Sequence, residues 1–161
     1  MKLVHIIGAD GTGKSTTCLE LENVLHSSHA HDLYRSNPSL HDFIGIYQLP
    51  DNEVVAIISQ GDLEQIIKKH IVELEKELNV LSLSFPDLDY LVLTSRSKGA
   101  GYCFVRKLCD TKIVGTKRLA SVNYFPFRTN KLTLNNNTEM DQKKLFAKFI
   151  WEASKNLSSI F

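Results

Sequence analysis

The sequence predicts an α/β protein of three layers, with a central parallel sheet and helices on both faces. Short apolar runs alternate with longer segments of helical periodicity along the 161 residues. The apolar runs are nearly continuous, which is typical of strands that are buried on both faces. A glycine-rich turn joins the first apolar run directly to the first helical segment. Because this length suits one hydrophobic core, we expect a single domain over residues 1–161.

The first part of the chain predicts three strands and one helix around a segment of mixed pattern. A buried strand is expected over residues 2–7, and a helix runs from Lys14 to about residue 26. A short strand follows over 32–35. Residues 40–49 have a mixed pattern that we interpret as a short helix, and residues 52–59 contain a second buried strand.

The clearest helix of the chain is expected to begin at Asp62. Asp62 and Gln65 have the spacing of a capping box. The apolar residues after Asp62 then repeat at helical spacing as far as Leu78. We therefore expect the side chain of Asp62 to cap the helix.

The remaining segments continue the alternation of strands and helices. Pro86 and Asp87 break the chain before the next apolar run. The elements expected after that break are a strand over 90–93, a helix over 99–108, a short strand at 113–114, a loop over 119–129, a short strand over 132–134 and a helix over 138–156. Right-handed crossovers would bring the carboxyl ends of parallel strands to one edge of the sheet, where ligands bind.

The turn after the first strand carries the complete pattern G-x-x-x-x-G-K-[ST], which is a P-loop. Its glycines let consecutive N–H groups face a phosphate, and the following helix presents its positive end to the same anion. Lys14 is the expected catalytic cation, and the hydroxyl of Ser15 the expected Mg²⁺ ligand. The residues expected to bind the nucleotide are Gly8, Asp10, Gly11, Thr12, Gly13, Lys14, Ser15 and Thr16.

Three segments in order resemble thymidylate kinases: the loop form beginning at Asp10, the strand and turn over 33–38, and the segment from Phe85 to Leu93. The resemblance implies a P-loop nucleotide-kinase fold. It also implies transfer of the γ-phosphoryl group of ATP to a nucleoside or deoxynucleoside monophosphate, with Mg²⁺. By the same resemblance, Arg35 would hold the acceptor phosphate and Asp10 would accept hydrogen bonds from the acceptor sugar or a bridging water.

A basic segment follows the strand over 90–93. Residues 94–131 contain nine basic residues and one acidic residue, although the net charge of the chain is only +1. In nucleotide kinases, a lid that carries arginines emerges near this point, so we expect a lid over residues 94–111. Arg96 is the first candidate for a catalytic cation because it follows a strand end directly. Further candidates are Lys98, Arg106, Lys117 and Arg118.

The chain departs from the thymidylate kinase pattern after the strand that contains residues 54–58. Those kinases carry an Asp-Arg pair there, whereas this chain reads Ser59-Gln60-Gly61-Asp62. The missing pair favours an alternative, a nucleotide-binding protein that has lost catalysis. The basic segment favours another, a polynucleotide 5′-kinase or other nucleic-acid-linked ATPase, so nucleic acid is a second, less favoured class of partner.

Composition excludes a membrane-embedded protein. No run of 18 apolar residues is present, so we expect no membrane partner. The first strand begins at the N-terminus without a leader pattern, and we expect a cytoplasmic protein. The three cysteines have neither metal-ligand spacing nor an even count for disulfides, which favours reduced thiols.

Overall fold

The computed structural model describes residues 1–36, 42–108, 121–124 and 136–156. Within these ranges the chain forms an α/β fold. Its elements in order are β1 (Lys2–Ile7), α1 (Lys14–Ser27), β2 (His31–Arg35), β3 (Ile44–Gln48), β4 (Val54–Ile58), α2 (Glu64–Val80), the 3₁₀ turn η1 (Phe85–Asp87), β5 (Tyr90–Ser95), α3 (Ala100–Leu108), β6 (Ser121–Tyr124) and α4 (Asn136–Asn156).

The described strands form one mixed sheet in the order β2-β3-β4-β5-β1-β6. Strands β4, β5, β1 and β6 run parallel to one another, whereas β3 pairs antiparallel with both β2 and β4. The expectation of a wholly parallel sheet is therefore wrong at β3. The reversal follows from the short connection between β3 and β4, because parallel strands need a crossover of a dozen or more residues. Asn52, at φ 68°, helps to close that turn.

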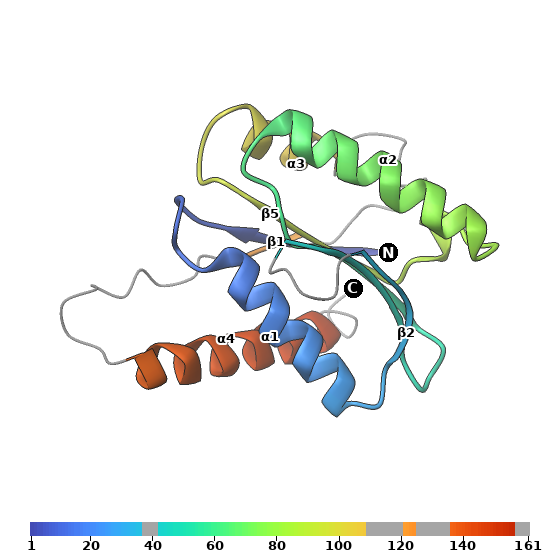
Figure 1. The fold of residues 1–161 in the computed structure, drawn as a ribbon, viewed down its shortest axis with the longest axis horizontal. Coiled ribbons are helices and arrows are strands. Elements are labelled where there is room, and N and C mark those ends of the chain that lie inside the picture. Colours follow the sequence, from blue (N-terminus) through green and yellow to red (C-terminus); the bar gives the residue numbers. More distant parts are fainter. Residues whose placement is uncertain (37–41, 109–120, 125–135, 157–161) are drawn as a thin grey trace.

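Helices cover both faces of the sheet, as expected (Figure 1). Helices α2 and α3 lie on one face, and α1 and α4 lie on the other. Each face has its own apolar core, and neighbouring residues of a strand alternate between the two. In β5, for example, Leu91 packs in the α2 core and Val92 in the α1 core. This alternation explains the continuous apolar pattern of the strands, because both faces are buried.

Two further expectations about secondary structure are corrected. Residues 44–48 form strand β3 instead of part of a short helix, and residues 121–124 form strand β6 inside the segment expected to be a loop. The strands expected at 113–114 and 132–134 lie outside the described residues. Helix α4 begins at Asn136, two residues before the expected position.

The expectation that Asp62 caps the following helix is also wrong. Helix α2 begins at Glu64, its N-cap is Leu63, and no side chain makes a capping hydrogen bond there. The neighbouring Gly61 packs so closely on β5 that an added Cβ would overlap the carbonyl oxygen of Thr94. This close approach brings the loop after β4 to the carboxyl end of β5 and directs the carboxylate of Asp62 toward Lys14 at the start of α1.

No helix within the described residues is long and apolar enough to cross a bilayer.

Candidate functional site

The loop between β1 and α1 has a backbone suited to an anion. Gly11 and Gly13 adopt positive φ angles of 68° and 85°, a region that glycine enters without steric cost. Gly13 is the N-cap of α1, and no side chain caps the helix. The first turn of α1 carries no acidic residue. The positive end of α1 is therefore left without an anionic side chain of its own, as an external phosphate requires.

Several hydrogen-bond donors of this loop converge on the carbonyl oxygen of Ala9. It accepts hydrogen bonds from Lys14 Nζ at 3.0 Å, from Thr12 Oγ1 at 2.8 Å and from the Thr12 backbone N–H at 3.4 Å. Lys14 thus folds back over its own loop, and its side chain is only 6% exposed. The lysine and the two glycines of the loop line the same pocket, and the space beside Gly11 is open.

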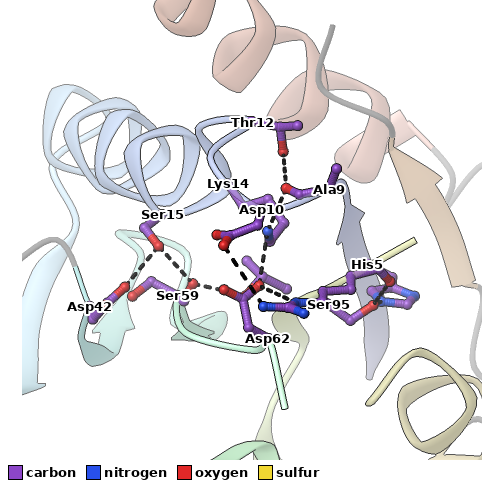
Figure 2. A network of polar contacts seen from close by, with 12 residues as sticks. His5, Ala9, Asp10, Thr12, Lys14, Ser15, Asp42, Ser59, Asp62 and Ser95 are labelled. Carbon is purple, nitrogen blue, oxygen red and sulfur yellow. Dashed lines mark hydrogen bonds and ion pairs between the residues drawn. The ribbon is translucent and has the colours of Figure 1, made fainter. Parts of the chain in front are cut away.

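Charged side chains from three loops meet beside Lys14 (Figure 2). Lys14 Nζ lies 3.0 Å from Asp62 Oδ1, and the same oxygen lies 3.9 Å from Arg96 Nε. Arg96 Nη2 lies 3.8 Å from Asp10 Oδ2. Asp62 Oδ1 is buried and makes no well-aligned hydrogen bond, so its interaction with Lys14 is ionic. Two cations predicted for the site, Lys14 and Arg96, therefore share one carboxylate in the bare protein.

The hydroxyl of Ser15 lies next to a second carboxylate. Ser15 Oγ donates to Asp42 Oδ1 at 2.8 Å and lies 3.3 Å from the carbonyl oxygen of Ser59. Asp42 precedes β3 and Ser59 follows β4, so two neighbouring strands bring them together. Figure 2 shows both groups on the side of Ser15 that faces the loop after β4. A hydroxyl and a carboxylate are hard oxygen donors of the kind that Mg²⁺ prefers.

These side chains border a pocket of about 410 Å³. Its lining residues are Asp10, Gly11, Gly13, Lys14, Ser15, Thr16, Asp42, Ser59, Gln60, Gly61, Asp62 and Lys143. The structure therefore places six of the eight expected nucleotide-binding residues around one cavity. The other two, Gly8 and Thr12, do not line it. Gly8 donates its N–H to the Ser95 carbonyl, and Thr12 bonds to Ala9.

The pocket fits a polyphosphate and a metal ion. The uncapped positive end of α1 and the side chain of Lys14 suit the phosphates, and the oxygens of Ser15 and Asp42 suit Mg²⁺. In the described part of the chain, no three His, Cys, Asp or Glu side chains cluster as a ready-made metal cage. A magnesium site commonly uses one or two carboxylates together with substrate phosphates, so the donors present here suffice.

Lys143 of α4 lies over the phosphate loop. An added Cβ at Gly13 would lie 2.7 Å from Lys143 Cε, and Lys143 lines the pocket. Lys143 was not expected at the site from the sequence. Asp42 was not expected there either, because the local sequence pattern of both residues is that of an ordinary surface charge. Only the packing of α4 and the reversal of β3 bring them to the loop.

Arg35, the expected contact for the acceptor phosphate, is held by an acidic partner. Its Nε and Nη2 donate to Glu22 Oε1 and Oε2 at 2.5 and 3.0 Å. Tyr47 OH also donates to Glu22 at 2.5 Å, and the guanidinium lies 4.3 Å from the Phe43 ring centre. The hydrogen bond to Glu22 raises the pKa of Arg35. Arg35 is not among the residues that line the pocket, and its acceptor role stays a prediction.

The other basic residues that the sequence suggested for the site differ in how near the structure places them to it. Arg96 follows β5 directly, is 45% exposed, and lies by Asp10 and Asp62. Lys98 is exposed, and Arg106 approaches the hydroxyl of Tyr102 at 3.5 Å. Lys117 and Arg118 lie outside the described residues, as does the end of the expected lid over 94–111.

Among the described cysteines, Cys18 is the one carried by the helix that follows the phosphate loop. Cys18 lies on α1, one turn beyond the phosphate loop, and is fully buried. Burial raises the pKa of its thiol, which disfavours the thiolate that nucleophilic chemistry needs.

A comparison with curated proteins finds one relative along nearly the whole chain. The chain is 26% identical over 159 residues to a thymidylate kinase of African swine fever virus (isolate Pig/Kenya/KEN-50/1950). The match covers 99% of this chain and 63% of the relative, so the chain spans less than two thirds of the relative's length. No protein-family model matches the chain, and no solved structure matches it. The chain is thus distantly similar to a protein described as a thymidylate kinase.

Proposed function

We propose that this chain is a P-loop nucleotide kinase that transfers the γ-phosphoryl group of ATP to a nucleoside or deoxynucleoside monophosphate with Mg²⁺. One observation carries the proposal: a lysine, a hydroxyl and an uncapped helix end converge on a single pocket. Phosphoryl transfer requires positioning and charge neutralisation more than covalent chemistry. The distant similarity to a thymidylate kinase and the order of the elements support the same class of reaction.

The residues of the chain would have separate tasks in this reaction. The N–H groups at the start of α1 and the ammonium of Lys14 would hold the β- and γ-phosphates. Arg96 would approach the transferring group from the end of β5 and neutralise charge that develops there. Ser15 would hold Mg²⁺, which when bound neutralises phosphate charge. Asp10 and Arg35 would contact the acceptor, as the resemblance implies.

The domain organisation is part of the proposal. Residues 1–161 would form one kinase domain, with residues 94–111 acting as a lid that excludes water from the phosphates. The position of Arg96 supports the start of this lid, because its guanidinium already lies within 4 Å of two carboxylates of the pocket.

The test is acceptor-dependent ADP formation. The protein is mixed with Mg-ATP and each nucleoside and deoxynucleoside monophosphate in turn, and ADP is followed by a coupled assay. We expect ADP with at least one acceptor, and a fall of about 100-fold or more for Lys14→Ala. Lys69→Ala, which removes an exposed lysine of α2 from outside the pocket, is the matched control and should retain the rate.

One observation favours a second candidate, a nucleotide-binding protein without transferase activity. Glu22 engages two nitrogens of Arg35, and Ser59-Gln60 stands where thymidylate kinases carry their Asp-Arg pair. This candidate predicts saturable binding of ATP or ADP in calorimetry with no ADP formed from any acceptor. The same two measurements therefore separate the two functions.

A further inference from the structure

We propose that Asp42 is the acidic ligand of the Mg²⁺ site and takes the place of an acidic residue after β4. The inference rests on the proposed function, since the metal would arrive with a nucleotide. The end of β4 itself offers Ser59 and Gln60, neither of which carries a charge. A magnesium–nucleotide site needs at least one carboxylate near the P-loop hydroxyl.

The reversed strand supplies that carboxylate. Because β3 is antiparallel to β4, the start of β3 lies at the same edge of the sheet as the end of β4, with Ile44 opposite Ile58. Phe43, which precedes β3, and Ser59, which follows β4, are joined by two hydrogen bonds. Phe43 N–H donates to Ser59 Oγ at 2.6 Å, and Ser59 N–H donates to the Phe43 carbonyl at 3.0 Å. Asp42 therefore stands directly beside the end of β4.

Asp42 contacts the hydroxyl of Ser15, the group proposed to bind the metal. Its Oδ1 lies 2.8 Å from Ser15 Oγ, and both residues line the pocket. The hydroxyl can present a lone pair to a cation while it continues to donate its proton to the carboxylate. The carboxylate has a second oxygen, Oδ2, which can bind the cation directly while Oδ1 accepts the hydrogen bond from Ser15.

Charge distinguishes Asp42 from the other nearby carboxylates. Asp62 Oδ1 lies 3.0 Å from Lys14 Nζ, and Asp10 Oδ2 lies 3.8 Å from Arg96 Nη2. Within the described residues, no cationic side chain forms an ion pair with Asp42. Among the described side chains, Asp42 is therefore the pocket carboxylate whose negative charge is not already engaged in an ion pair.

The experiment uses Mn²⁺ as a paramagnetic probe of the metal site, with the full chain and saturating ADP. Free Mn²⁺ is counted by electron paramagnetic resonance during titration of the wild type, Asp42→Asn and Asp42→Glu. We expect Asp42→Asn to weaken Mn²⁺ binding by at least about tenfold and Asp42→Glu to recover part of the loss. ADP binding in EDTA should remain as tight as in the wild type, because the substitution removes no contact to phosphate.

Two control variants make the test specific. Asp51→Asn removes an exposed carboxylate from the turn before β4 and should bind Mn²⁺ as the wild type does. The second variant, Asp62→Asn, tests the rival carboxylate of the pocket: with ADP saturating we expect Mn²⁺ still to bind, whereas a loss would assign the metal to Asp62. Circular dichroism and the EDTA measurement verify that each variant is folded.

Different results would overturn different claims. If Asp42→Asn binds Mn²⁺–ADP like the wild type, or if Asp62→Asn loses Mn²⁺ instead, Asp42 is not the ligand, and the proposed kinase function is untouched. If the wild type binds neither ADP nor Mn²⁺–ADP, the proposed function fails and this inference fails with it.

Discussion

The ammonium of Lys14 lies 3.0 Å from Oδ1 of Asp62, an ion pair that joins the start of α1 to the loop after β4. Lys14 is 6% exposed and the side chain of Asp62 is 33% exposed, so the pair is partly shielded from water. An incoming phosphate would have to replace Asp62 as the partner of Lys14. The carboxylate therefore competes with the ligand that the pocket is suited to hold.

Asp62→Asn should consequently bind metal-free ADP more tightly than the wild type. Removal of the charge frees Lys14 and Arg96 from a competing anion, while the Ala9 carbonyl still accepts from Lys14. A pair of this exposure contributes about 1 kcal/mol, which corresponds to an increase in affinity of about fivefold. Isothermal titration calorimetry in EDTA measures it, with Asp51→Asn as the control. Weaker binding would show instead that Asp62 holds Lys14 in its binding position.

Tyr47→Phe should destabilise the fold without touching the pocket. The buried hydroxyl of Tyr47 donates to Glu22, which also holds Arg35, so its loss leaves a buried carboxylate short of one donor. A hydrogen bond to a charged group contributes about 1.5–3 kcal/mol, and we expect a loss of this size in the free energy of unfolding. Urea denaturation followed by fluorescence is the measurement.

Tyr34→Phe is the matched control for that substitution. Burial raises the pKa of Tyr34, yet its hydroxyl makes no hydrogen bond in the described part of the chain. Its removal should change the free energy of unfolding by less than about 0.5 kcal/mol. Equal losses in the free energy of unfolding for Tyr47→Phe and Tyr34→Phe would show that the hydrogen bond between Tyr47 and Glu22 does not stabilise the fold.

Gly61→Ala should destabilise the protein and disturb the pocket together. The added Cβ would overlap the Thr94 carbonyl, so the loop after β4 would have to move away from β5. Overpacking of this kind costs about 1–3 kcal/mol, and the shift would carry Asp62 away from Lys14. Thermal unfolding and ADP calorimetry measure the two effects. Gln60→Ala, one residue earlier, should leave stability nearly unchanged; a stable Gly61→Ala protein with normal affinity would refute the close packing.

Asp87→Asn should reduce stability at neutral pH but not in acid. The hydroxyl and the backbone N–H of Ser84 both donate to Asp87 Oδ2, at 2.6 and 2.8 Å, and lower the pKa of Asp87 below its usual 3.8. A lowered pKa in the folded state contributes stability above the unfolded value, and this contribution is lost as pH falls through the folded value. The gap between wild type and variant in urea midpoint should therefore narrow below about pH 4. A constant gap from pH 7 to pH 2.5 would exclude this linkage.

The sequence was sufficient to predict most of the parallel core, because buried parallel strands carry continuous apolar runs that persist whatever surrounds them. It was insufficient for β3. Gly45 and Gln48 interrupt the apolar pattern of that strand, and the segment was interpreted as a helix. The short connection over 49–53 would have indicated an antiparallel hairpin once 44–48 was recognised as a strand.

Only the part of the site that belongs to a contiguous sequence motif could be predicted. The phosphate loop is contiguous in sequence, so its spacing alone predicts where Lys14 and Ser15 lie. Asp62 matched the spacing of a helix cap, but the tertiary contact with Lys14 prevailed over that local preference. Asp42 and Lys143 reach the loop from elements that are distant in sequence. A single sequence carries no local pattern that indicates such tertiary contacts.

Lys143 lies over Gly13, so one wall of the pocket comes from a helix that is synthesised long after the loop it covers. A nascent chain on the ribosome would present an unfinished pocket until α4 emerges and packs on α1. Nucleotide in the cell would then stabilise only chains in which α4 has docked, and a protein cut before Asn136 should be more exposed to proteolysis and gain less protection from ADP.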